Sequence, residues 1–192
     1  MPTADELKDR GVAEYLRGDY ELAVETFRAA AAQYGDDGVA DMVAEMQVNL
    51  GLALHSLGQH DAALEQMTQA HAVFAQMKDA HRTAQALGNM ARVYAGQGNS
   101  EQAITNYREA AAIFNELGDE ENYGQTVLAI ADLQLRGGQV MKAAATYEVG
   151  LKHVKNRNAR QKWMKKLLGL RNRLGGGWPV RADLCNSVTN PS

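Results

Sequence analysis

Two asparagines at matching positions are the clearest candidates for molecular recognition in this sequence. Asn49 and Asn89 are forty residues apart, and each lies nine residues before a glycine. An amide side chain carries both a hydrogen-bond donor and an acceptor, so it can pair with a peptide unit whatever side chain that unit bears. In the alternative interpretation, the two amides bond only to a neighbouring helix or to water. The positions one period earlier and one period later hold Asp9 and Ala129, so the pair does not extend further.

A basic segment near the C-terminal end is a second candidate site. Residues 152–173 contain nine lysines and arginines and no acidic residue, whereas residues 1–151 contain 10 basic and 22 acidic residues and have a net charge of −12. The segment from Asn156 to Leu174 is predicted to form one amphipathic helix, because apolar residues recur in it at helical spacing. One apolar stripe consists of Trp163, Leu167, Leu170 and Leu174, with Met164 and Leu168 beside it. The cations among these residues form a candidate electrostatic patch, which consists of Lys162, Lys165, Lys166, Arg171 and Arg173.

The sequence contains no motif for catalysis, metal binding or cofactor binding. Its five histidines, at positions 55, 60, 71, 81 and 153, fall on different expected helices or turns without the spacing of metal ligands. Neither Gly137-Gly138 nor Gly175-Gly176-Gly177 is followed by the Lys-Ser/Thr pair that a phosphate-binding loop requires. We therefore expect a protein that is not an enzyme and that uses no metal, no cofactor and no small-molecule substrate.

The recognition residues must be positioned by helices that recur every 40 residues. Glycine occurs at positions 18, 58, 98 and 138, and an alanine follows each of these glycines five residues later. Three further columns have the same period. They are Phe27, Met67, Tyr107 and Tyr147; Val24, Leu64, Ile104 and Ala144; and Tyr34, Phe74, Phe114 and Val154. Each glycine is expected to separate two antiparallel helices, because glycine adopts the left-handed backbone at a helix end without steric cost.

An all-α fold is predicted from the same chain. Proline occurs only at positions 2, 179 and 191, and apolar residues show no period-two alternation, so nothing between residues 3 and 178 favours strands or forbids helix. The expected helix caps are Thr3 with Glu6 as a capping box, Asp19 and Asn99 after the turn glycines, and Asp79 and Asp119 at the next helices.

Two stretches resemble the tetratricopeptide repeat. The first is Gly11-Val-Ala-Glu-Tyr15 with Gly18-Asp-Tyr20, Ala23, Phe27 and Ala30, and the second is Asn89-Met-Ala-Arg-Val-Tyr94 with Gly98, Ala103, Tyr107 and Ala110. The resemblance covers about residues 4 to 155. The usual repeat has about 34 residues, whereas the 40-residue period resembles the subgroup of Leu-Gly-Asn-repeat (Pins-type) adaptors, kinesin light chains and bacterial peptide-sensing regulators. This resemblance implies a right-handed helical solenoid of four helix-turn-helix repeats, and the amphipathic segment after them is expected to be a C-terminal capping helix.

The resemblance also implies where a ligand binds. Family members present the first helix of each hairpin on a concave face that holds an extended or helical peptide. The residues of this chain on that stripe are Lys8, Val12, Tyr15, Asn49, Leu52, His55, Gln85, Asn89, Arg92, Asp132 and Arg136. A clamp for chaperone C-termini would need asparagine, lysine and arginine where this chain has Val12, Gln85 and Asn89, so chaperone docking is disfavoured.

The expected organisation is four repeats at about residues 4–35, 39–75, 79–115 and 119–155, a capping helix at 156–174 and a flexible tail at 175–192. No apolar run reaches the roughly 18 residues that a membrane helix needs, and the N-terminal residues are too polar and acidic for a signal peptide. The single cysteine, Cys185, can form no internal disulfide. We therefore expect a cytoplasmic protein without a transmembrane segment.

The sequence favours an adaptor that binds a protein or peptide whose identity it does not specify. In one alternative, the chain forms a homo-oligomer whose copies dock through the basic helix, because that helix and the acidic body carry opposite charges. Nucleic acid or an anionic membrane surface is a less favoured partner for the same helix.

Overall fold

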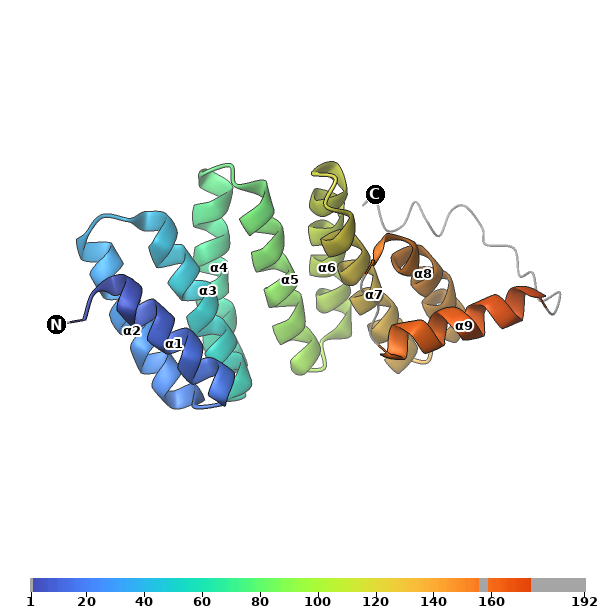
Figure 1. The fold of residues 1–192 in the computed structure, drawn as a ribbon, viewed down its shortest axis with the longest axis horizontal. Helices are drawn as coiled ribbons and strands as arrows, with labels where there is room; N and C mark the ends of the chain where they lie inside the picture. Colours follow the sequence, from blue (N-terminus) through green and yellow to red (C-terminus); the bar gives the residue numbers. More distant parts are fainter. Residues whose placement is uncertain (1, 156–158, 174–192) are drawn as a thin grey trace. The chain divides into compact units, whose positions relative to one another are not determined.

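The polypeptide is entirely helical over the residues that the structure describes (Figure 1). The computed structural model describes residues 2–155 and 159–173, and within these ranges it contains nine α-helices and no β-strand. The helices are α1 Ala4–Arg17, α2 Tyr20–Asp36, α3 Ala40–Ser56, α4 His60–Gln76, α5 Ala80–Gly96, α6 Ser100–Glu116, α7 Glu120–Arg136, α8 Val140–His153 and α9 Ala159–Arg173. The predicted all-α fold is confirmed.

A residue with a left-handed backbone follows each of the helices α1 to α7. These residues are Gly18, Gly38, Gly58, Lys78, Gly98, Gly118 and Gly138, with φ between 58° and 88°. The four predicted reversals, at 18, 58, 98 and 138, are therefore confirmed. The three turns between them lie at the predicted boundaries of the repeats, but a left-handed residue at each was not predicted. They show that the 40-residue period consists of two similar steps of one helix and one turn.

Most of the predicted helix caps are present. Thr3 and Glu6 form the complete capping box of α1, and Asp79 and Asp119 accept backbone N–H groups at the starts of α5 and α7. The prediction for Asp19 was wrong: its carboxylate makes no cap and instead accepts a hydrogen bond from Arg17 Nε at 2.9 Å. The guanidinium of Arg17 competes with the backbone for this carboxylate.

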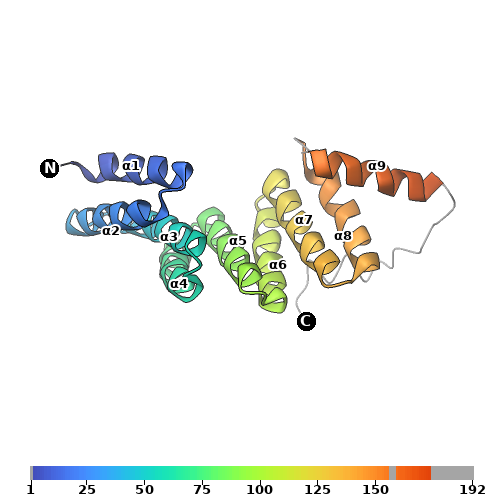
Figure 2. The same cartoon turned by 90° about the horizontal axis from the view of Figure 1, so that it is seen from below.

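The first compact unit, Met1–Asn99, contains helices α1 to α5. Consecutive helices pack against each other, and Figure 2 shows α1 lying alongside α2. In addition, α1 contacts α3 and α3 contacts α5, so these three helices form one layer. The core between the helices is built from the almost completely buried side chains of Phe27, Met46, Leu54, Met67 and Val93.

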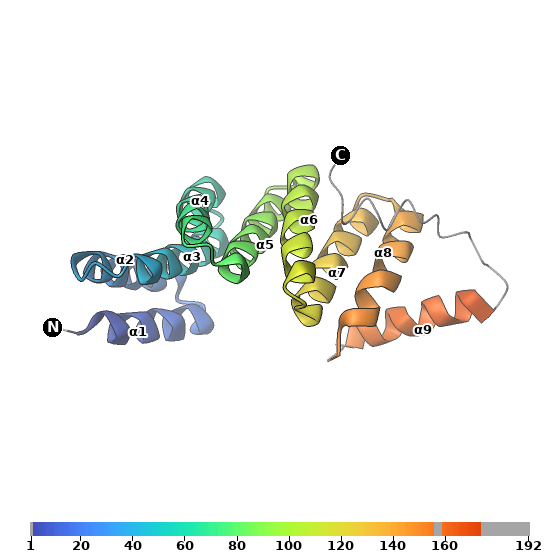
Figure 3. The same ribbon diagram turned by 90° about the horizontal axis from the view of Figure 1, so that it is seen from above.

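The second compact unit, Ser100–Ser192, contains helices α6 to α9. Within it, α7 packs against α6 and α8, and α9 lies against α8 (Figure 3). The buried residues of this core include Leu128 on α7, Tyr147 on α8 and Val154 directly after α8. As in the first unit, the alanines of the repeat pattern are buried where two helices meet: Ala23, Ala63, Ala103 and Ala143 are at most 1% exposed.

Helix α9 packs through one of its two apolar stripes. Leu168 is buried in the core of the second unit and Met164 packs against it, whereas Trp163 is 59% and Leu167 41% exposed. The sequence pattern did not determine which stripe would be covered. The side chain of Leu170 and the expected tail at 175–192 lie outside the described residues.

Candidate functional site

The layer of α1, α3 and α5 carries nine of the eleven predicted ligand-binding residues. They are Lys8, Val12 and Tyr15 on α1, Asn49, Leu52 and His55 on α3, and Gln85, Asn89 and Arg92 on α5. All nine are exposed or half-buried. Because α3 contacts both α1 and α5, the three helices that carry these residues are neighbours in the first unit. We call the nine residues on these three helices the first-helix face.

Asn49 and Asn89 lie on adjacent helices of the first-helix face. Both side chains are half-buried, and neither amide makes a hydrogen bond to another side chain or backbone group among the described residues. A half-buried amide that has no protein partner retains its full donor and acceptor capacity for a ligand. The structure thus places the two residues that the sequence singled out on two helices that contact each other.

Asp5 lies in the first turn of α1, next to Lys8 of this face. On α1, Asp5 accepts a hydrogen bond from the hydroxyl of Tyr34, and this bond holds the pKa of the Asp5 carboxyl below its usual value. Burial raises the pKa of Tyr34, and the carboxylates of Asp5, Glu45 and Asp9 raise it further. Lys8 lies within 3.5 Å of Asp5, so its ammonium group is partly neutralised.

His55 connects three helices. Its Nδ1 lies 3.1 Å from Nδ1 of His60 on α4, and the two rings are 5.0 Å apart. A Cβ atom at Gly96, the last residue of α5, would lie 2.7 Å from His55 Cε1, so α5 passes close to the ring. Burial lowers the pKa of His55, and the nearby His60 and Arg92 lower it further. The sequence did not predict this pair, because the five-residue spacing across the Gly58 turn indicates that both residues flank one turn but not that their rings meet.

The two remaining predicted residues lie on α7, in the second unit. Asp132 is half-buried and accepts a hydrogen bond from the hydroxyl of Tyr147 on α8. Arg136 is exposed in the last turn of α7. The carboxylate of Asp132 therefore takes part in the packing of its own hairpin.

The predicted electrostatic patch is partly described. Lys162, Lys165 and Lys166 are exposed on α9, and the side chains of Arg171 and Arg173 lie outside the described residues. Over the described part of the chain, no three histidine, cysteine, aspartate or glutamate side chains are grouped so that they could hold a metal ion. None of the described helices is long and apolar enough to span a membrane.

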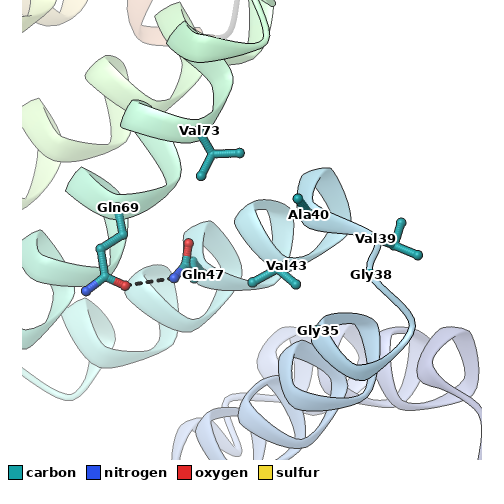
Figure 4. Close-up of a pocket in the computed structure, with 8 residues that line it drawn as sticks. All are labelled: Gly35, Gly38, Val39, Ala40, Val43, Gln47, Gln69 and Val73. Carbon is teal, nitrogen blue, oxygen red and sulfur yellow. Dashed lines mark hydrogen bonds between the residues drawn. The ribbon is translucent and has the colours of Figure 1, made fainter.

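A pocket that the sequence pattern did not predict lies between the end of α2 and the helices α3 and α4 (Figure 4). Its volume is about 290 Å³. It is lined by Gly35, Gly38, Val39, Ala40, Val43, Gln47, Gln69 and Val73. At one edge, Gln47 Nε2 donates a hydrogen bond to Gln69 Oε1 at 2.7 Å. Gln47 and Asn49 are about 200° apart around α3, so this pocket, which we call the valine pocket, does not belong to the first-helix face.

Comparison with known proteins agrees with this architecture. The tetratricopeptide repeat family model matches residues 42–116 and 82–156. No curated protein sequence matches the chain.

Three solved structures resemble the chain. BtubC (BKLC) from P. vanneervenii has a TM-score of 0.71 at 16% identity over 96% of this chain and 77% of that one. A candidate kinesin light chain from Podosopora anserina with nearly identical TPR-like repeats has a TM-score of 0.70 at 18% identity over 98% and 95%. Rap protein complexed with Competence and Sporulation Factor has a TM-score of 0.55 at 18% identity over 93% and 60%.

Proposed function

Because this chain belongs to the tetratricopeptide repeat family, we propose that it holds an extended or helical segment of a partner protein against its first-helix face. The fold of the family is that of a scaffold for protein–protein interaction. The proposal includes four repeats with α9 as a capping helix, a cytoplasmic location and no catalytic role. The structure of Rap protein complexed with Competence and Sporulation Factor, which has a similar fold, supports a protein or peptide segment as the ligand.

The observation that carries the proposal is the state of Asn49 and Asn89. Each amide is half-buried on a neighbouring helix of the same layer and has no hydrogen-bonding partner in the described part of the protein. Two such amides, one on each of two successive hairpins, can bind two peptide units of one ligand segment. Val12 and Leu52 offer apolar contact on the same surface, while Arg92 lies one turn beyond Asn89.

A second candidate function is self-association through α9. The observation that favours it is the exposure of Lys162, Lys165 and Lys166 in a chain whose first 151 residues have a net charge of −12. The same cations could attract nucleic acid or an anionic surface, and affinity for nucleic acid would fall steeply as salt is raised.

The test begins with affinity purification from the native lysate and mass spectrometry to identify the partner. Calorimetric titration of the partner segment should then show a five- to tenfold weaker dissociation constant for Asn49→Ala and for Asn89→Ala, since one lost hydrogen bond costs about 1 kcal/mol or slightly more. The double variant should lose nearly the sum of the two free energies, because the amides would contact different peptide units.

Two further variants serve as controls for this titration. Gln76→Ala removes an exposed amide from α4, away from the first-helix face, and should bind as the unchanged protein does. Lys162→Glu/Lys166→Glu should also bind normally. Full affinity for the partner in both asparagine variants would contradict the proposal. Loss of binding in the lysine variant alone would mean that the binding site lies on α9.

A further inference from the structure

We propose that the valine pocket of one copy of this chain receives the exposed Trp163 side chain on α9 of a second copy. The contact lies outside the first-helix face, and it rests on the second candidate function, self-association through α9, for which it names the receiving site.

The pocket exists because two positions of the repeat carry small side chains. Val43 and Val73 correspond, two periods later, to Tyr123 and His153, whose rings pack edge to face with centroids 4.8 Å apart. The first unit thus leaves room where the second unit has an aromatic pair. A cavity of about 150 Å³ accommodates benzene, so a pocket of about 290 Å³ has room for an indole ring.

Helix α9 presents a side chain of the required kind. Met164 and Leu168 pack towards the core of the second unit, which leaves Trp163 and Leu167, four residues apart, as an exposed apolar pair. A tryptophan that is 59% exposed is the largest apolar side chain on the described surface. Buried tryptophans usually find an acceptor for the indole N–H, and Gln47 Oε1 at the edge of the pocket has no partner among the described residues.

The charges around the two features are complementary. Asp36 and Asp37 are exposed on the turn between the pocket glycines Gly35 and Gly38, and Glu65 lies one helical turn before Gln69 on α4. Around Trp163, the exposed neighbours are Lys162, Lys165 and Lys166. Opposite charges at the rim of an apolar contact accelerate association and select its orientation. This complementarity favours a second copy of the chain over an uncharged apolar partner.

The proposed contact joins two different surfaces, and each copy carries one pocket and one Trp163. Two copies can therefore exchange the contact reciprocally in a twofold dimer, or each copy can contact a different neighbour so that rings or open chains form. A contact with a single aromatic anchor is small and belongs to the weak class of interfaces.

The experiment is sedimentation equilibrium of the full chain over a range of concentrations, at low and at high salt. We expect the average mass to rise with concentration and the rise to be weaker at high salt. Trp163→Ala should weaken association at least tenfold, because central tryptophans dominate binding energies. Val43→Phe, which fills the pocket, should do the same. Leu22→Ala, which removes an exposed leucine from α2, is the matched control and should associate normally.

Complementation distinguishes this contact from other modes of association. The Trp163→Ala variant retains the pocket and the Val43→Phe variant retains Trp163, so an equimolar mixture should form 1:1 dimers and nothing larger. If Val43→Phe does not fold, the variant Asp36→Lys/Asp37→Lys is used in its place and should weaken association through charge repulsion at the pocket. Mixing it with a copy that carries Lys162→Glu/Lys166→Glu should restore the contact between the two copies. Asn49→Ala/Asn89→Ala should leave self-association unchanged. A chain that remains monomeric at every concentration, or variants that associate like the unchanged protein, would overturn the proposal.

Discussion

Lys78 occupies a turn position that is glycine at the six other turns between α1 and α8. Its φ of 58° places a residue with a Cβ atom in the left-handed region. The turn is otherwise like that at Gly118: Asp79 N donates to Phe74 O at 3.0 Å, and Asp119 N donates to Phe114 O at 2.9 Å. The hydrogen bonds of the two turns are alike, so the only cost at Lys78 is the steric strain of a left-handed backbone in a residue with a Cβ atom.

Two single substitutions, glycine for Lys78 and lysine for Gly118, should change the free energy of unfolding in opposite directions. Lys78→Gly should raise the free energy of unfolding by about 0.5 kcal/mol, because relief of the left-handed strain exceeds the added entropy of the unfolded chain. Gly118→Lys should lower it by about 1 kcal/mol. Crowding does not contribute at either position, since Lys78 is exposed and a Cβ atom at Gly118 would meet nothing within 4 Å. Urea denaturation measures both, and equal signs for the two variants would refute the explanation.

The contact of His55 with His60 predicts a dependence of stability on pH. Burial, His60 and Arg92 lower the pKa of His55 in the folded protein from its ordinary 6.5, so the unfolded chain binds the proton more tightly. The contribution of neutral His55 to the free energy of unfolding is fully present above pH 6.5. It is lost as the pH falls towards the lowered pKa of His55 in the folded state.

The measurement compares the free energy of unfolding of the wild-type (unchanged) protein with that of the His55→Gln variant. Urea denaturation at about pH 7.5 and about pH 5.5 should show a larger loss of unfolding free energy in the unchanged protein than in the variant. All other titrating groups are present in both proteins, so the difference reports His55 together with its contact to His60. An identical loss in the two proteins would contradict this account.

At the scale of the element, α9 depends on two adjacent leucines that face in different directions. Leu168 is 8% exposed in the core of the second unit, whereas Leu167 is 41% exposed. Leu168→Ala should lower the free energy of unfolding by about 2 kcal/mol, and Leu167→Ala should change it by less than about 0.5 kcal/mol. Urea denaturation monitored by circular dichroism at low protein concentration gives both values. The same loss for both leucines would mean that α9 packs through the other stripe.

At the scale of the whole molecule, the chain consists of two compact units, and one cluster of buried residues lies within each of them. Helices in a repeat protein interact mainly with their neighbours, so a local defect need not unfold the rest. Met67→Ala in the first core should therefore remove hydrogen-exchange protection mainly within residues 1–99, and Leu128→Ala in the second core mainly beyond residue 99. Native-state hydrogen exchange with mass spectrometry resolves this. Equal losses of protection in both units would show that the chain unfolds as one body.

The sequence alone determined the helices, the four repeat turns and the buried columns that begin at Ala23, Phe27 and Tyr34. Glycine at a helix end, alanine at a helix crossing and apolar residues at helical spacing act over a few residues, and the 40-residue period repeats the same local signals. The alignment of Asn49 with Asn89 followed from this period, because equivalent positions of successive hairpins lie on one face. A non-glycine left-handed residue such as Lys78 gave no such signal.

Only the tertiary structure decided the features that depend on side chains meeting across helices. The pairing of His55 with His60 and the bond from Tyr147 to Asp132 depend on how two helices are rotated against each other. Both stripes of α9 have helical periodicity, and the shape of the core that α8 offers selects Leu168 over Trp163 for burial. The valine pocket results from the summed volumes of side chains on three segments, and no single stretch of sequence contains that quantity.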